Sequence, residues 1–102
     1  MTTQRYVVIF KAKTKSLDAT YLSMAKNMRE KALNKYNCQL FEAVTELDFE
    51  IALSYWNSLD DIHAWHIDTD HQIAQKIGKE KWYSYFSVEI CEILKSYQSE
   101  RE

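Results

Sequence analysis

The sequence contains no proline and a single glycine, Gly78, among its 102 residues. Average usage would supply about five prolines and seven glycines, so other residues must make the turns. Asparagine and aspartate are the expected substitutes, because both tolerate the left-handed backbone region and bond their own backbone. The candidates are Asp18, Asn37, Asp48, Asn57 and Asp60. A single glycine also excludes the glycine-rich loops in which nucleotide cofactors usually bind.

Long apolar runs and a strong excess of one charge are also missing. No apolar run approaches the roughly 20 residues that span a bilayer. The opening segment MTTQRYVVIFKAK lacks the apolar stretch and cleavage site of a signal peptide. We therefore expect a cytoplasmic protein without a membrane partner. The net charge of −2, without a basic stripe, gives no electrostatic support for binding nucleic acid.

The remaining composition is that of a globular protein. Apolar residues make up 46% of the chain and charged residues 27%, which predicts one folded domain over residues 1–102. The polar segment from about residue 96 to residue 102 is expected to form a loose tail. Cys38 and Cys91 are expected to be buried thiols rather than a disulfide, and neither lies in a motif typical of a catalytic cysteine.

Alternating apolar and polar residues predict four strands, at about 6–12, 40–46, 49–56 and 82–94. The second and third form a hairpin that turns near Leu47 and Asp48. In most of these strands, apolar or aromatic side chains occur on both faces, which indicates that both faces of the sheet are covered.

Helical periodicity predicts one long helix at about 17–36 and two short helices between 58 and 77. Ser16 or Asp18 would cap the long helix and Asn37 would end it. Its buried stripe comprises Tyr21, Met24, Ala25, Met28 and Ala32. The patterns Ser58-x-x-Asp61 and Thr69-x-x-Gln72 would start the short helices, and Gly78 would end the second.

The resulting order, β-α-β-β-α(α)-β, predicts an α+β fold of the ferredoxin-like, split βαβ type. This fold is a four-stranded antiparallel sheet with helices on one face. Because the other face is apolar as well, we expect it to pack against a second copy and form a homodimer.

All three tryptophans and all three histidines lie between Leu53 and Tyr85. If Thr69 caps a helix, His71 is near its positive end, which disfavours the imidazolium ion. A neutral imidazole beside a pocket can exchange a proton with a phenol or an enolisable ketone. The alternative is that His71 bonds a neighbouring group such as Asp70.

His63, His66 and His71, with Asp68 and Asp70 nearby, suggest a metal site as another possibility. Their spacing matches no established zinc signature. We therefore expect His63 and His66 to be packed or rim residues and predict no metal.

The aromatic residues Trp56, Trp65, Trp82 and Tyr83 are either pocket walls or ordinary core. Asn57 follows the third predicted strand and is first of all a turn residue. Its side-chain amide could also polarise a carbonyl group of a substrate.

The segment SYWNSLDDIHAWHIDTDHQIAQKIGKEKWYSYFSVEI, together with the opening strand YVVIF and the helix after it, resembles the antibiotic biosynthesis monooxygenase family of dimeric α+β barrels. The matching positions are Tyr55-Trp56, Trp65, His71, Ala74-Gln75, Gly78 and Trp82-Tyr83. The resemblance implies a homodimeric, cofactor-free monooxygenase that oxidises an aromatic quinol- or anthrone-like molecule with O₂. It implies Trp65 as a pocket wall, with His71 and Asn57 as polar, catalytic partners.

Two features separate the chain from the haem-degrading branch of that family. Gln75 stands where that branch has its iron-binding histidine, and Phe10 or a neighbour stands where it has an asparagine in the first strand. The resemblance therefore disfavours haem, and no cofactor is expected. Asn37-Cys38 replaces the common Pro-Gly step before the second strand. The alternative function is a non-catalytic binding or stress-related protein that holds a small hydrophobic ligand in the same pocket.

Overall fold

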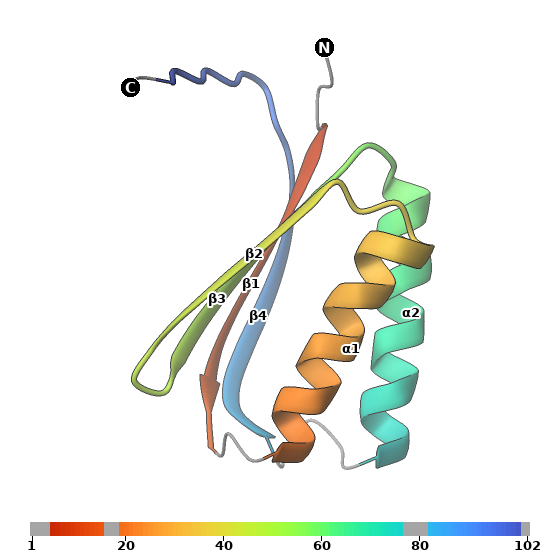
Figure 1. Cartoon of the computed structure of the whole chain (residues 1–102), viewed down its shortest axis with the longest axis vertical. Coiled ribbons are helices and arrows are strands. Elements are labelled where there is room, and N and C mark those ends of the chain that lie inside the picture. Colours follow the sequence, from red (N-terminus) through yellow and green to blue (C-terminus); the bar gives the residue numbers. More distant parts are fainter. Residues whose placement is uncertain (1–4, 16–18, 77–81, 101–102) are drawn as a thin grey trace.

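The protein folds into one antiparallel sheet covered on one face by two helices (Figure 1). The structure is a computed structural model that describes residues 5–15, 19–76 and 82–100, and for residues 71–76 only the backbone. The elements are β1 Tyr6–Thr14, α1 Ala19–Lys35, β2 Leu40–Glu46, β3 Phe49–Trp56, α2 Leu59–Lys76 and β4 Tyr83–Glu92.

The strand order is β2-β3-β1-β4, and all neighbouring strands are antiparallel. This order and the single helical layer confirm the predicted ferredoxin-like α+β fold. Among the described residues, no helix has both the length and the apolar character needed to cross a bilayer.

The prediction of two short helices after β3 was wrong, because α2 is one continuous helix from Leu59 to Lys76. The Ser58 hydroxyl accepts the Asp61 N–H at 3.3 Å, which confirms the first cap. Thr69 lies inside the helix, where its hydroxyl donates to the His66 carbonyl at 3.1 Å. No glycine or proline interrupts this stretch, so a threonine that bonds the preceding turn does not end the helix.

Two turns are made without glycine. Asn37 ends the segment after α1 with a φ of 65°, in the left-handed region that was predicted for it. The β2–β3 hairpin turns at Leu47 and Asp48 as expected, but Leu47 takes the positive φ of 57°. The Thr14 backbone N–H donates to the Asp48 carbonyl at 2.8 Å, so this turn is tied to the end of β1. The caps predicted at Ser16, Asp18 and Gly78 lie outside the described residues.

The strand registers decide which side chains face the helices. Val8 of β1 is opposite Ser54 of β3, and Phe10 is opposite Ala52. On the other side of β1, Phe10 is opposite Val88 of β4. Even-numbered residues of β1, β3 and most of β4 therefore share the helix-facing side, and Tyr83 joins them because the β1–β4 register shifts between Lys13 and Thr14. The residues on the outer side include Ile9, Ile51 and Leu53.

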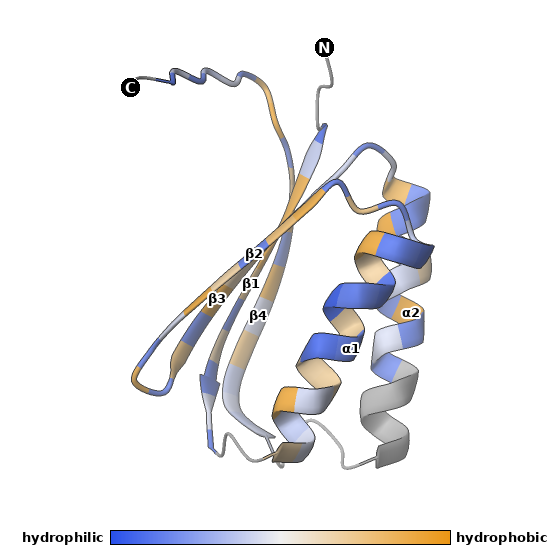
Figure 2. Ribbon diagram, in the orientation of Figure 1, coloured by the Kyte–Doolittle hydropathy of each residue, from blue (hydrophilic) through white to orange (hydrophobic). Residues whose placement is uncertain are grey.

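The core between sheet and helices consists of two clusters. One joins Ala12, Tyr21, Met24, Trp82 and Tyr83. The other joins Val8, Ala32, Cys38, Trp56 and Ile62. Tyr21, Met24 and Ala32 belong to the predicted stripe of α1 and are buried, which confirms its orientation. Figure 2 shows that apolar residues also follow the strands of the sheet, while α1 carries polar residues between its apolar ones.

Candidate functional site

A cavity of about 530 Å³ lies between the helix-facing side of the sheet and the two helices. Small side chains leave this space open: Ala25 on α1, Ala43 on β2, and Ala52 with Ser54 on β3. Pockets of roughly 300–1,000 Å³ are the usual size for small organic ligands. The cavity is therefore large enough for a molecule of two or three fused rings.

Aromatic rings form much of the cavity wall. The Trp65 ring lies 6.1 Å from the Phe41 ring, and Phe10 contacts Tyr83 edge to face at 5.6 Å. Phe86 stacks near Phe10 at 6.3 Å. On the β4 side, Phe86 is 39% exposed and Ile90 is 53% exposed, so solvent reaches the cavity along this strand. A flat apolar ligand can enter there and contact ring faces.

Two of the four residues predicted as walls line the cavity, and two do not. Trp65 and Tyr83 line it. Trp56 and Trp82 are fully buried and belong to the packed clusters instead. The Trp56 indole N–H donates to the Ser54 hydroxyl at 2.8 Å. The Trp82 indole nitrogen has no hydrogen-bond partner among the described residues, but its complete burial keeps it away from a cavity ligand.

Of the two predicted polar partners, the structure describes only the side chain of Asn57. Asn57 is exposed at the junction of β3 and α2 and does not line the cavity. His71 lies within α2, five residues before its last residue, and its side chain is outside the described part. The argument that placed His71 at a helix N-terminus was therefore wrong, because α2 starts at Leu59. Its catalytic role stays a prediction.

His66 is the histidine that the structure places at the cavity. Its side chain is half exposed and its Nε2 lies 3.1 Å from Asp70 Oδ2, one helical turn later. Both residues line the cavity, and so His66 is a rim residue, as predicted. An imidazole held by a carboxylate can accept a proton from a bound molecule. The sequence contained the i, i+4 spacing of this pair, but it did not show which face of α2 meets the cavity.

A second polar group in the cavity wall was missed by the sequence interpretation. The Tyr21 phenol of α1 donates a hydrogen bond to Glu50 Oε1 of β3, and the Tyr83 phenol lies 3.5 Å from the Tyr21 oxygen. All three line the cavity. Burial, followed by the hydrogen bond to Glu50, raises the pKa of Tyr21 well above its ordinary value. Burial also raises the pKa of Tyr83, so both phenols stay protonated at neutral pH.

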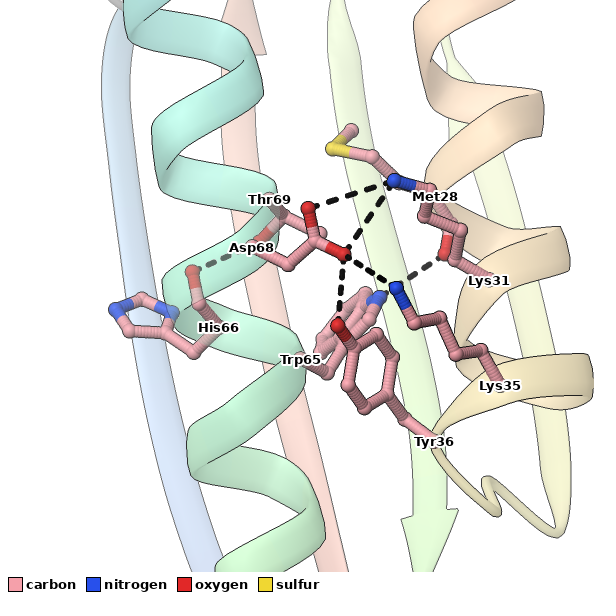
Figure 3. A network of polar contacts seen from close by, with 8 residues as sticks. All are labelled: Met28, Lys31, Lys35, Tyr36, Trp65, His66, Asp68 and Thr69. Carbon is pink, nitrogen blue, oxygen red and sulfur yellow. Dashed lines mark hydrogen bonds and ion pairs between the residues drawn. The ribbon is translucent and has the colours of Figure 1, made fainter.

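A group of ion pairs and hydrogen bonds ties α1 to α2 (Figure 3). Lys31 Nζ lies 3.4 Å from both carboxylate oxygens of Asp68, and the Tyr36 hydroxyl donates to Asp68 at 2.8 Å. Lys35 Nζ lies 4.0 Å from Asp68 Oδ2. The Trp65 indole N–H donates to the Met28 carbonyl of α1 at 3.0 Å. These contacts fix Trp65, and with it one wall of the cavity.

Asp68→Ala is expected to lower the free energy of unfolding by about 2 kcal/mol. The estimate combines one hydrogen bond to a charged group with ion pairs discounted for their partial exposure. For a domain of this size that corresponds to a melting temperature lower by roughly 10 °C. Asp68→Asn, which still accepts from Tyr36, should lose less. An unchanged melting temperature for Asp68→Ala in a thermal circular-dichroism scan would contradict this assignment.

The described residues contain no group of three or more His, Cys, Asp or Glu side chains placed to hold a metal ion. Cys38 is buried and Cys91 half-buried, and both are free thiols, as predicted. Burial raises the pKa of the Cys38 thiol, which makes it a poor nucleophile at neutral pH. The described cavity wall carries carboxylate, phenol, imidazole and cationic side chains.

Sequence comparison finds one clear relative. The chain is 33% identical over 89 residues to the Bacillus subtilis protein YqjZ, described as uncharacterised, and the match covers 86% of this chain and 78% of that protein. No protein-family model matches the chain.

Solved structures share the fold at low sequence identity. SnoaB from Streptomyces nogalater, described as a cofactor-independent oxygenase, has a TM-score of 0.70 at 7% identity, over 95% of this chain and all of that one. A putative antibiotic biosynthesis monooxygenase from Chloroflexus aurantiacus has a TM-score of 0.59 at 10% identity, over 91% and 96%. A dimeric ferredoxin-like protein of unknown function from Bacteroides fragilis has a TM-score of 0.52 at 13% identity, over 86% and 95%. The structural similarity establishes a common fold, but sequence identities this low leave the reaction open.

Proposed function

The chain belongs to the family of the Bacillus subtilis protein YqjZ, and from its cavity we propose that it is a small monooxygenase acting on an aromatic quinol- or anthrone-like molecule. The oxidant would be O₂, and no cofactor would take part. The resemblance to antibiotic biosynthesis monooxygenases noted in the sequence supports this proposal. The fold that the chain shares with a cofactor-independent oxygenase supports it too.

The observation that carries the proposal is the composition of the cavity wall. Aromatic and aliphatic side chains surround a space of about 530 Å³, and a few polar groups, among them His66 and Glu50, interrupt them. An apolar site with a few convergent polar groups is the usual form of a small-molecule site. Such a wall suits a flat ring system that carries one or two hydroxyl or keto groups.

The reaction needs one proton acceptor, and His66 with its partner Asp70 supplies one at the cavity rim. For an anthrone, a base removes a proton from the CH₂ carbon, and the resulting carbanion adds O₂ to give a hydroperoxide after protonation. Loss of water from the hydroperoxide then leaves a carbonyl group. One O₂ oxidises the CH₂ carbon by four electrons, with one oxygen atom in the product and the other in water.

The test is oxygen consumption with 1,8-dihydroxyanthrone, with expected uptake of one O₂ per anthrone and no hydrogen peroxide. His66→Ala should lower the turnover rate by about 100-fold, the contribution typical of a positioned base. His63→Ala, an exposed position on the same helix, is the matched control. His71→Ala tests the base predicted from the sequence. Loss of turnover in His71→Ala with normal turnover in His66→Ala would assign the role of base to His71 instead of His66.

The competing function is a non-catalytic protein that holds a hydrophobic ligand. Saturable binding of the anthrone without oxygen uptake above the uncatalysed rate would favour it. Titration with haemin provides a further check, since the proposal expects no stoichiometric shift of the haem absorption band.

We also propose that the outer face of the sheet forms a homodimer. None of the described helices packs on this face (Figure 1), although Ile9 of β1 and Leu53 of β3 lie paired on it. Phe49 is 40% exposed and Tyr85 is 54% exposed there. Lys13 lies between Phe49 and Tyr85 in the sheet, but large exposed apolar side chains gathered on one face often mark an interaction surface. A second copy presents the same surface, so an isologous contact would bury it on both subunits.

A further inference from the structure

We propose that Tyr83, Tyr21 and Glu50 form a proton-accepting anchor, so that the cavity selects aromatic molecules bearing a free hydroxyl group. This inference rests on the proposed function for the location of the ligand, and it adds the ligand's defining chemical group. Tyr83 would contact the ligand hydroxyl directly. Glu50 would hold the proton at the far end of this series of three side chains.

The three side chains come from separate elements and are held by ring packing. Tyr21 on α1 lies edge to face against Trp82 at 5.3 Å and against Tyr83 at 5.9 Å. Tyr83, at the start of β4, also packs against Phe10 and against Phe86 at 5.8 Å. Tyr21 is 3% exposed and Tyr83 is 8% exposed. The two phenol groups are therefore fixed in position before any ligand binds.

The hydrogen bonds run in one direction, from Tyr83 through Tyr21 to Glu50. A carboxylate accepts and does not donate, and each phenol has one proton to give. Because Tyr21 donates to Glu50, the Tyr21 oxygen is left to accept from Tyr83. The Tyr83 oxygen then presents lone pairs to the cavity. A ligand O–H satisfies them, whereas an ether or hydrocarbon does not.

The charges around the cavity favour transfer of the ligand proton. Among the described residues, no lysine, arginine or histidine forms an ion pair with Glu50. Lys26 and Arg29 of α1 line the same cavity and would stabilise an anionic ligand oxygen. Since burial raises the pKa of both phenols and keeps them protonated, each phenol gives up its own proton as it accepts another, and neither remains ionised.

The step is a proton relay that balances without another reactant. The ligand O–H bond breaks as a new O–H bond forms on the Tyr83 oxygen. The original Tyr83 proton moves to Tyr21, and the original Tyr21 proton moves to Glu50. The proton ends on the Glu50 carboxyl group and the negative charge ends on the ligand oxygen. The oxyanion makes the attached ring more electron-rich, which would make a quinol easier for O₂ to oxidise.

The test compares 2-naphthol with 2-methoxynaphthalene, which has the same rings but no O–H, by fluorescence titration of the intact protein. The wild type should bind 2-naphthol about tenfold more tightly, as expected for one hydrogen bond to a charged network. Tyr83→Phe should bring the two affinities within about twofold, because it removes the contact. Glu50→Gln should reduce the preference to about threefold, since neutral acceptors bind roughly half as strongly. Glu30→Gln, the same change on the exposed side of α1, should keep the full preference.

The outcomes separate this inference from the proposed function. Equal affinity for both probes in the wild type overturns the anchor and leaves the oxygenase proposal standing. A clear preference for 2-naphthol that Tyr83→Phe abolishes, without oxygen uptake on anthrones, supports the anchor and overturns the oxygenase. If neither probe binds, the anchor and the ligand cavity are both wrong.

Discussion

Replacing Ala25 by tryptophan is expected to weaken 2-naphthol binding at least about 100-fold and to abolish anthrone oxidation. Ala25 lies on α1 in the cavity wall, and an indole there would occupy the space that the ligand rings need. A buried aromatic ring removes roughly 150–250 Å² from water, at about 25 cal/mol per Å². Losing that contact costs roughly 3.8–6.3 kcal/mol, which exceeds the 2.7 kcal/mol or so that a 100-fold change requires. Fluorescence titration measures the loss.

The matched control is Ala64→Trp, the same substitution at an exposed position of α2. It should bind 2-naphthol with wild-type affinity. Thermal unfolding of both variants checks that each still folds. If Ala25→Trp folds and binds 2-naphthol as tightly as the wild type, the ligand does not occupy this cavity.

Leu53→Lys is expected to convert the proposed dimer into a monomer. Leu53 lies on the outer face of β3, a central strand of the sheet, opposite Ile9 of β1. In an isologous dimer the substitution occurs twice, and each unpaired buried charge costs about 3 kcal/mol. This raises the dissociation constant by at least roughly 100-fold. Analytical ultracentrifugation at micromolar concentration measures the change in mass.

Leu33→Lys serves as the control, because Leu33 is 40% exposed on α1, away from the outer face. Tyr85→Lys is a second interface variant whose side chain is already 54% exposed in the single chain, so it should fold normally. A wild-type protein that sediments as a monomer would refute the dimer. So would variants at Leu53 and Tyr85 that remain dimeric.

Much of the fold could be predicted because it depends on local patterns. The two segments with period-two alternation form β2 and β3 with the expected bounds. Asn37 adopts the left-handed conformation that its side chain tolerates. The break near Thr69 was predicted wrongly. A Thr-x-x-Gln pattern looks the same whether the threonine caps a helix or bonds the turn before it. In the continuous α2, the Thr69 hydroxyl bonds the preceding turn.

The candidate site could be predicted only in part. Trp65, Tyr83 and the rim position of His66 agree with the sequence interpretation. Glu50 was not recognised, although it alternates with Ile51 in a pattern that was visible. Apolar residues occupy both faces of β3, and Phe49, Ile51 and Leu53 lie on the outer face. Alternation therefore could not show that Glu50, Ala52 and Ser54 are the residues facing the helices.

The sequence by itself determined the element order, the fold class and the absence of glycine-rich phosphate loops, because these follow from periodicity and composition. The tertiary structure alone decided where small residues meet. Ala25 on α1 faces Ala52 and Ser54 on β3 across the layers, and a cavity exists because no side chain there is long enough to fill it. It also decided that Tyr21, Glu50 and Tyr83, which are far apart in the chain, join in that wall. Contacts between distant residues depend on register and helix packing, which no local pattern specifies.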